Sequence, residues 1–148
     1  MQDRVQKARE YFLTGYNCAQ SVFLAFADVL GLTKEEAARI ASPFGAGFGR
    51  MREVCGTVSA MTMVLGYMEG NESPDDQEAK TRIYVREREL AAYFLEEQKS
   101  LVCREILGLK KGEEEPPAPA ERTLAYYESR PCLHCVETAA RIIEEHIL

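Results

Sequence analysis

Residues 54–68 read Val-Cys-Gly-Thr-Val-Ser-Ala-Met-Thr-Met-Val-Leu-Gly-Tyr-Met and contain no charged side chain. A helix over this stretch would be apolar on most sides, which is typical of a buried helix rather than of an amphipathic surface helix. The preceding segment, residues 42–52, carries glycine at three alternate positions, and glycine is unfavourable inside a helix. The sequence therefore predicts a glycine-rich loop with irregular backbone that leads into a buried central helix beginning at Gly56.

The rest of the chain shows helical spacing of apolar residues nearly throughout, with no convincing alternation typical of a strand. Asn17 and Thr33 are residue types that cap helix N-termini, and Glu36 completes a capping box with Thr33. The expected helices span about residues 3–13, 17–30, a short segment after 33, 56–68, 73 to 99 or 107, and 131–148. We therefore expect an all-α fold, a single-domain helical bundle of about five or six helices.

The composition indicates one soluble domain. With 148 residues, of which 46% are hydrophobic, the chain can bury a core without disulfides, so we treat residues 1–148 as one cysteine-containing helical domain. Within it, the acidic and proline-rich residues 109–120 are expected to form an exposed, mobile linker. The net charge of −6 argues against a nucleic-acid partner. No apolar run approaches the roughly 18 residues of a membrane span, and the first residues lack the apolar core of a secretory signal. These features predict a cytoplasmic protein.

Five cysteines in such a chain indicate metal or redox chemistry more than structural disulfides, because the cytoplasm keeps most thiols reduced. Four of them lie at turns that resemble helix starts. There the helix dipole and free backbone N–H groups favour thiolate, and so lower the thiol pKa from about 8.5 towards neutrality. The fifth lies late in the long predicted helix or just after it, and is expected to be a buried core residue. The four are Cys18, Cys55, Cys132 and Cys135, and the fifth is Cys103.

The sharpest local motif is Cys132-Leu133-His134-Cys135. Two cysteines at this spacing at a helix start suit a dithiol that closes to a disulfide, and equally a zinc or iron–sulfur site. A thioredoxin-like fold is not indicated, since no strand precedes the motif. His134 is a candidate metal ligand or proton donor, and simple packing of the two cysteines is the alternative interpretation.

Two arginines follow the glycines of the loop, in Gly45-Ala46-Gly47-Phe48-Gly49-Arg50-Met51-Arg52. The loop matches neither the dinucleotide fingerprint nor the P-loop, so a packing role is favoured over nucleotide binding. Arg50 and Arg52 are nevertheless candidates for binding an anion. Arg104 is a candidate to stabilise a thiolate at Cys103, although a solvated side chain is the more common role for an arginine beside a cysteine.

In several of these segments the chain resembles the C_GCAxxG_C_C family of redox-active proteins. The resemblance rests on Gly15-Tyr16-Asn17-Cys18-Ala19-Gln20, the loop Gly45–Arg50, Cys55-Gly56, Cys103-Arg104-Glu105-Ile106-Leu107-Gly108 and Cys135-Val136. It implies that Cys18, Cys55, Cys103 and Cys135 are the family cysteines and that Cys132 is an addition. The family motif Cys-Gly-Ala-x-x-Gly reads Cys55-Gly56-Thr57-Val58-Ser59-Ala60 here. The extra methyl groups of Thr57 and Ala60 are expected to narrow the approach to this turn and to weaken the fit of a cofactor.

The first functional hypothesis is thiol–disulfide or electron-transfer chemistry by a thiol-dependent oxidoreductase that acts with an unknown redox partner. In it, a low-pKa thiolate at Cys55 or Cys135 attacks, and a neighbour such as Cys132 resolves the mixed disulfide. The second is a metal or iron–sulfur protein. Cys18, Cys55, Cys103 and Cys135 would then converge on a zinc ion or a cluster.

The third hypothesis, from a different class, is a structural or interaction module whose cysteines are incidental. Its support is the methionine content of the central helix, which serves equally well as core filling. We rank redox chemistry slightly above metal binding, and both above the interaction module. A homodimer is expected if the helix over residues 56–68 is not fully covered.

Overall fold

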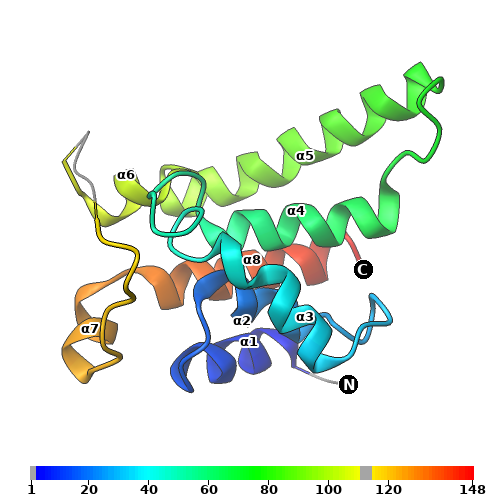
Figure 1. The fold of residues 1–148 in the computed structure, drawn as a ribbon. Coiled ribbons are helices and arrows are strands. Elements are labelled where there is room, and N and C mark those ends of the chain that lie inside the picture. The colour runs from blue at the N-terminus through cyan, green and yellow to red at the C-terminus, as the bar shows by residue number, and fades with distance from the viewer. Residues whose placement is uncertain (1–2, 111–114) are drawn as a thin grey trace.

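The computed structural model describes residues 3–110 and 115–148, and within these ranges it contains helices and one isolated antiparallel bridge but no named strand. This confirms the all-α fold of a single domain (Figure 1). Six of the helices have eight residues or more, which agrees with the five or six expected. The elements are α1 Arg4–Leu13, α2 Cys18–Ala25, α3 Lys34–Ala41, the 3-10 turn η1 Ser42–Phe44, α4 Gly56–Glu69, α5 Gln77–Gln98, α6 Cys103–Leu107, α7 Leu124–Ser129 and α8 Cys132–His146.

The core lies between α1, α2, α4 and α8. Helices α2 and α8 each pack against the other three, while α5 lies along α4 and α8 as an outer helix (Figure 1). Helix α4 supplies large side chains that are almost completely buried, Met61, Val64 and Leu65 among them. The 22-residue α5 buries only Leu90 and Phe94. The uncharged stretch is therefore a central helix, as its composition predicts.

Helix starts are where the sequence is most informative. Asn17 and Thr33 each form a capping box, with Gln20 and Glu36 respectively. The ends are less well predicted, because α2 stops at Ala25 and turns carry the chain to residue 31. The long helix begins after Asp76 rather than at residue 73, and it ends at Gln98 before a left-handed residue, Lys99, with φ of 68°.

Residues 109–120 were expected to be an exposed, mobile linker. Residues 111–114 of that segment lie outside the described residues, and residues 116–119 are exposed. Glu115, however, is held by two ion pairs, and α7, which the sequence did not predict, follows at residue 124. None of the helices in the described ranges has the length and apolar character needed to cross a membrane.

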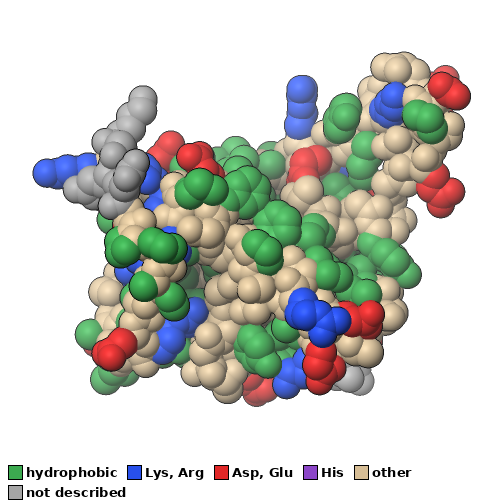
Figure 2. Space-filling view, in the orientation of Figure 1, with side chains coloured by type: hydrophobic (Ala, Val, Ile, Leu, Met, Phe, Trp, Pro, Cys, Tyr) green, Lys and Arg blue, Asp and Glu red, His purple; other side chains and the backbone are tan. Residues whose placement is uncertain are grey.

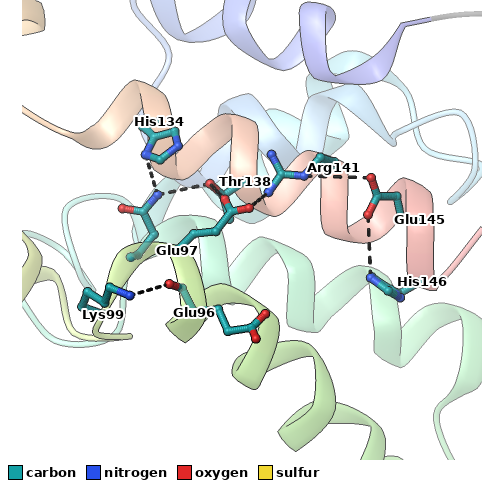
Figure 3. Close-up of polar contacts among 9 residues, drawn as sticks. Glu96, Glu97, Lys99, His134, Thr138, Arg141, Glu145 and His146 are labelled. Carbon is teal, nitrogen blue, oxygen red and sulfur yellow. Dashed lines mark hydrogen bonds and ion pairs between the residues drawn. The ribbon is translucent and has the colours of Figure 1, made fainter.

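The outer helix is tied to α8 by polar side chains (Figure 3). Thr138 donates to a carboxylate oxygen of Glu97 over 2.8 Å, and Arg141 pairs with the other oxygen of the same carboxylate. His134, on the same face of α8, makes a 2.9 Å hydrogen bond with the Gln98 side chain. These contacts orient the first turns of α8, which carry two of the cysteines.

Helix α4 is not covered along its whole length. Tyr67 and Met68, near its C-terminal end, are 62% and 43% exposed. A homodimer was expected if this helix is not fully covered, and at this end it is not. The homodimer itself stays a prediction.

Candidate cysteine site

All five cysteines line one cavity of about 410 Å³ at the end of the bundle where α6 and α7 lie. Its wall also takes residues from the end of α1, from the glycine-rich loop and from the segment that leads to α7. In the structure each of the five is a free thiol. The cysteine residues that the sequence singled out are therefore brought together, although they come from four separate parts of the chain.

Each thiol stands at or near the start of a helix, as the local sequence predicts for all of them except Cys103. Cys103, expected late in the long helix or after it, opens a short helix of its own and is 7% exposed, so its burial is confirmed. Cys18 is the first residue of α2, Cys55 is the N-cap of α4, Cys132 is the first residue of α8, and Cys135 lies one turn further along α8.

A short antiparallel pairing brings the segments of Cys55 and Cys103 together. The Cys55 N–H donates to Leu101 O over 2.8 Å, and the Cys103 N–H donates to Glu53 O over 2.7 Å. These bonds flank the bridge between Val54 and Val102. Because backbone hydrogen bonds set this spacing, the two thiols are positioned by main chain rather than by flexible side chains.

Gly56 lets Cys18 approach the start of α4. A Cβ placed on Gly56 would lie 2.7 Å from Cys18 Sγ and 3.0 Å from the backbone oxygen of Phe44. Real Cβ atoms essentially never come within 3.0 Å of another heavy atom, so any larger residue at this position would displace the Cys18 side chain and press against the loop. Glycine is thus required at position 56 because the Cys18 side chain packs directly against it.

Cys55 carries the thiol that ionises most readily. The Cys135 thiol donates a hydrogen bond to its sulfur, and this contact, helped by the Thr57 hydroxyl and by the N–H groups of Thr57 and Val58, outweighs burial and lowers the pKa of Cys55 to about 7. Thr57 Oγ1 lies 3.1 Å from Cys55 Sγ. At neutral pH a large fraction of Cys55 is therefore thiolate.

For Cys18, Cys132 and Cys135 the expectation of a lowered pKa is wrong, because the pKa of each is raised. The pKa of Cys103, which was expected to be a buried core residue, is raised as well. The donated hydrogen bond raises the pKa of Cys135 well above its ordinary value, with burial adding to the effect. Burial is the leading cause of the raised pKa of Cys18 and of Cys103, and it raises the pKa of Cys132 to about 11. A helix start therefore lowers a thiol pKa only where hydrogen-bond donors to the sulfur offset the cost of burying its charge. A thiolate nearby raises the pKa further, because two negative charges repel each other.

The arginine beside Cys103 is not the one expected from the sequence. Arg104 donates to the backbone oxygen of Lys110 over 2.8 Å. Arg52, which is only 3% exposed, places its guanidinium 3.5 Å from Cys103 Sγ. Burial lowers the pKa of Arg52, but its hydrogen bonds to Cys103 and Glu115 outweigh this, so the pKa is raised and the side chain stays cationic.

His134 lies outside this group. Its ring is bound to Gln98 on the α5 side of α8 and does not line the cavity (Figure 3). The proposed role as a proton donor to a cavity thiolate therefore has no contact to support it. Among residues 3–110 and 115–148, no three side chains of His, Cys, Asp or Glu are grouped closely enough to hold a metal ion.

The comparison with family models gives a match. The family described as "Putative redox-active protein (C_GCAxxG_C_C)" matches residues 16–146. The chain belongs to this family. No curated protein and no solved structure matches the chain.

Two positions at which this C_GCAxxG_C_C member departs from the family motif have a clear structural setting. Thr57, in place of alanine, is fully buried and puts its hydroxyl against the Cys55 sulfur. Ala60, in place of glycine, is fully buried in the core. The extra methyl groups do not block the close approach at this turn, because that approach is made by Cys18 at Gly56.

Several cavity residues were not predicted from the sequence. Arg122 lies over the rings of Phe12 and Tyr126, at 4.9 and 4.8 Å from their centroids, and Arg130 lies 4.6 Å from the Tyr126 centroid. Tyr126 lies in α7, whose N-cap is Thr123, since the Thr123 side chain accepts a hydrogen bond from the Tyr126 N–H. Threonine is a typical N-cap residue, so Thr123 was the sequence signal for this helix.

Proposed function

We propose that the protein is a thiol-dependent oxidoreductase of the cytoplasm that exchanges thiols and disulfides through Cys55. The observation that carries this proposal is that Cys55 and Cys135 line the same cavity, with Thr57 Oγ1 3.1 Å from Cys55 Sγ. The hydrogen bond with Cys135 and the Thr57 hydroxyl lower the pKa of Cys55 to about 7. A thiolate attacks best when its pKa lies near the ambient pH. The family name supports the redox class without naming a reaction.

The reaction begins when the Cys55 thiolate attacks one sulfur of a small disulfide. A bond forms between Cys55 Sγ and that sulfur, the original S–S bond breaks, and the departing thiolate takes a proton from solvent. The protein is then a mixed disulfide, and no external electron donor has been used. The Thr57 hydroxyl and the N–H groups at the start of α4 orient the attacking sulfur.

Cys135 resolves the mixed disulfide. Its pKa is raised first by the hydrogen bond to Cys55 and then by burial and by the charge on Cys55. Once Cys55 is neutral in the mixed disulfide, the hydrogen bond to a thiolate and the charge are both gone, so Cys135 ionises more easily. Its thiolate attacks Cys55 Sγ, and the second small thiol leaves with a proton. In sum, one small disulfide is reduced to two thiols, and the Cys55 and Cys135 thiols are oxidised to a disulfide. Cys132 is the second candidate for this resolving role.

A zinc or iron–sulfur site remains the second candidate function. It is favoured by one observation, that Cys18, Cys55, Cys103 and Cys135 line the same cavity. Metal binding would itself deprotonate the buried thiols whose pKa is raised. Against it, the thiols would have to move closer together, since no three of them form a ready metal site within the described chain.

The test begins with protein purified without oxygen, whose metal content is measured before it is reacted with the neutral hydroxyethyl disulfide. Mass spectrometry then locates the new disulfide. We expect little bound metal and a Cys55–Cys135 disulfide. Cys55→Ser should slow the reaction at least about tenfold, because the other thiols have raised pKa values, and Cys135→Ser should accumulate the mixed disulfide on Cys55.

Cys132→Ser is the control, since the Cys55–Cys135 disulfide should still form in it. A full rate in Cys55→Ser would refute Cys55 as the nucleophile. About one metal ion or cluster per chain, lost on replacing any of Cys18, Cys55, Cys103 or Cys135 but not Cys132, would establish the metal function instead.

A further inference from the structure

The cysteine cavity is lined by positive charge, although the chain as a whole carries a net charge of −6. Four arginines line it, and no carboxylate is among the described lining residues. In the space-filling view, Lys and Arg side chains gather at this end of the molecule beneath the segment that leads to α7 (Figure 2). Such a concentration of one sign of charge in a cavity attracts ligands of the opposite sign. The four are Arg50, Arg52, Arg122 and Arg130.

Two of these arginines are presented by an unusual backbone. Every residue from 46 to 50 has a positive φ, and so has Arg52, with φ of 60°. Left-handed backbone costs about 1–2 kcal/mol for each residue that is not glycine, and such strain is concentrated at functional sites. Here the left-handed turn brings Arg50 and Arg52 to the same cavity and to the same carboxylate.

That carboxylate belongs to Glu115. Its Oε2 accepts from Arg50 Nη2 over 3.1 Å and from Arg52 Nε over 2.7 Å. The segment that follows contributes Pro117 and Pro119 to the cavity wall. Both guanidinium groups thus donate to the same carboxylate oxygen of Glu115. Two guanidinium groups can instead bind both oxygens of a carboxylate.

The arginine pair is not saturated by this contact. Arg50 Nε is buried and has no hydrogen-bond partner among the described residues. A buried donor without a partner costs about 1–3 kcal/mol, so a purely structural ion pair would be expected to satisfy it. An additional acceptor in the cavity would remove that cost.

The same arginines are connected to the thiols. Arg52 contacts Glu115 with one part of its guanidinium group and lies 3.5 Å from Cys103 Sγ with another. Cys55 lines the same 410 Å³ cavity. A cavity of this volume is within the range that small-molecule sites occupy, roughly 300–1,000 Å³.

We propose that the small disulfide that this protein reduces carries a carboxylate, which binds Arg50 and Arg52 in the place that Glu115 occupies in this structure. The reaction side of this inference rests on the function proposed above, whereas the binding of a carboxylate by the arginine pair does not. Glu115 acts as an internal competitor, so an external carboxylate must displace it.

Binding is tested without any thiol chemistry. The probe is octanedioate, which has the length of 3,3′-dithiodipropionate but no disulfide, titrated calorimetrically into the full-length reduced protein. Octanedioate should bind the wild type weakly. Glu115→Gln should tighten binding about tenfold, because the competing charge is removed, and Arg50→Gln should weaken it by a similar factor. Arg39→Gln, on the exposed side of α3, is the matched control and should bind as the wild type does.

The reaction is tested with three symmetrical disulfides of similar size and different charge: anionic 3,3′-dithiodipropionate, neutral hydroxyethyl disulfide and cationic cystamine. The anionic one should react faster than the cationic one, and Arg50→Gln should reduce this preference about tenfold. Glu115→Gln should increase the preference for the anionic disulfide.

The outcomes separate the two proposals. Octanedioate binding that depends on Arg50, together with no disulfide exchange, would overturn the thiol function and leave an anion site. Exchange through Cys55 with no preference among the three disulfides, and no octanedioate binding even in Glu115→Gln, would overturn the carboxylate inference and show that the pair of Glu115 with the arginines is structural only.

Discussion

Cys55 differs from the other four thiols in the number of donors that face its sulfur. The hydrogen bond from Cys135 is the largest influence that lowers its pKa, and the Thr57 hydroxyl adds a second. Both side chains are buried, so neither donor is weakened by competition from water. Each donor can be removed without changing the sulfur itself.

We therefore expect Cys135→Ala and Thr57→Val each to raise the Cys55 pKa from its value of about 7. The alkylation rate of Cys55 by iodoacetamide, followed by mass spectrometry from pH 5 to 9, rises with the thiolate fraction. In the wild type its midpoint should fall near pH 7, and in each variant it should move upward. An upward shift of one pKa unit should make the variants react about tenfold more slowly at pH 6, because below the pKa the thiolate fraction falls tenfold for each unit.

Thr62→Val is the matched control, because Thr62 is on the same helix but exposed. It should leave the profile unchanged. An unaltered midpoint in both Cys135→Ala and Thr57→Val would mean that the helix N-terminus alone sets the Cys55 pKa.

The residue scale also shows what sequence can and cannot predict about a thiol. The position of Cys18 or Cys55 at a helix start depends on nearby residues such as Asn17 and Gly56, and these are visible in the sequence. The thiol pKa depends on burial and on neighbours far along the chain, such as Cys135 beside Cys55. The local sequence therefore predicted the helix-start positions of Cys18, Cys55, Cys132 and Cys135 correctly. The lowered pKa expected there holds for Cys55 and is wrong for the other three.

At the scale of elements, the start of α4 combines two opposing demands on Gly56. Glycine within a helix is less favourable than alanine by about 0.5–1 kcal/mol. An added methyl group here would, however, lie 2.7 Å from Cys18 Sγ and 3.1 Å from Ala19 Cβ. The packing of α2 against the start of α4 therefore outweighs helix propensity at this position.

Gly56→Ala should consequently destabilise the protein by about 1–3 kcal/mol, the usual cost of overpacking a core. Gly66→Ala, in the same helix, adds a methyl group that meets nothing within 4 Å, so it should stabilise the protein by about 0.5–1 kcal/mol. Urea unfolding of the reduced proteins gives both free energies of unfolding. A stable Gly56→Ala variant with unchanged Cys18 reactivity would contradict the close packing of the two helices.

The elements predicted from sequence are those whose signals are local. The cap at Asn17, the capping box at Thr33 and the uncharged stretch of α4 each predicted a helix correctly. The glycines of the loop correctly indicated irregular backbone, but not that Ala46, Phe48 and Arg50 are left-handed as well. That conformation is stabilised by loop hydrogen bonds such as the one from the Glu53 N–H to Gly47 O, a pairing that composition does not reveal.

At the scale of the whole molecule, the cavity exists because segments more than 100 residues apart in sequence meet at one end of the bundle (Figure 1). No local pattern contains that information, and so the sequence left open whether the thiols meet in pairs or as a group. One side of the cavity is formed by residues between Pro117 and Tyr126, which lead into α7, and α7 itself has no buried residue. Elements with so few buried contacts open at low free-energy cost.

Arg122 connects this segment to the rest of the bundle, as Tyr127 also does through hydrogen bonds to the backbone oxygens of Phe12 and Leu13. Arg122 donates to the backbone oxygens of Tyr16, over 3.1 Å, and of Phe12, over 3.4 Å, and its guanidinium lies over the Phe12 and Tyr126 rings. A cation over an aromatic ring contributes about 0.5–1 kcal/mol, and a hydrogen bond from a charged donor contributes about 1.5–3 kcal/mol. Loss of this side chain should therefore favour opening of the cavity more than unfolding of the core.

We predict that Arg122→Ala exposes the cavity thiols to solvent while the bundle remains folded. Labelling of Cys18 and Cys132 by the neutral reagent N-ethylmaleimide should accelerate about tenfold, since each 1.4 kcal/mol of lost closing energy changes the open population by that factor. Helical circular dichroism should be preserved, and Arg39→Ala, exposed on α3, should label at the wild-type rate. Because the reagent carries no charge, faster labelling reports access to the cavity and not the loss of a positive charge that attracts anions. Equal rates in Arg122→Ala and the wild type would place the entry to the thiols on another side of the cavity, through the glycine-rich loop.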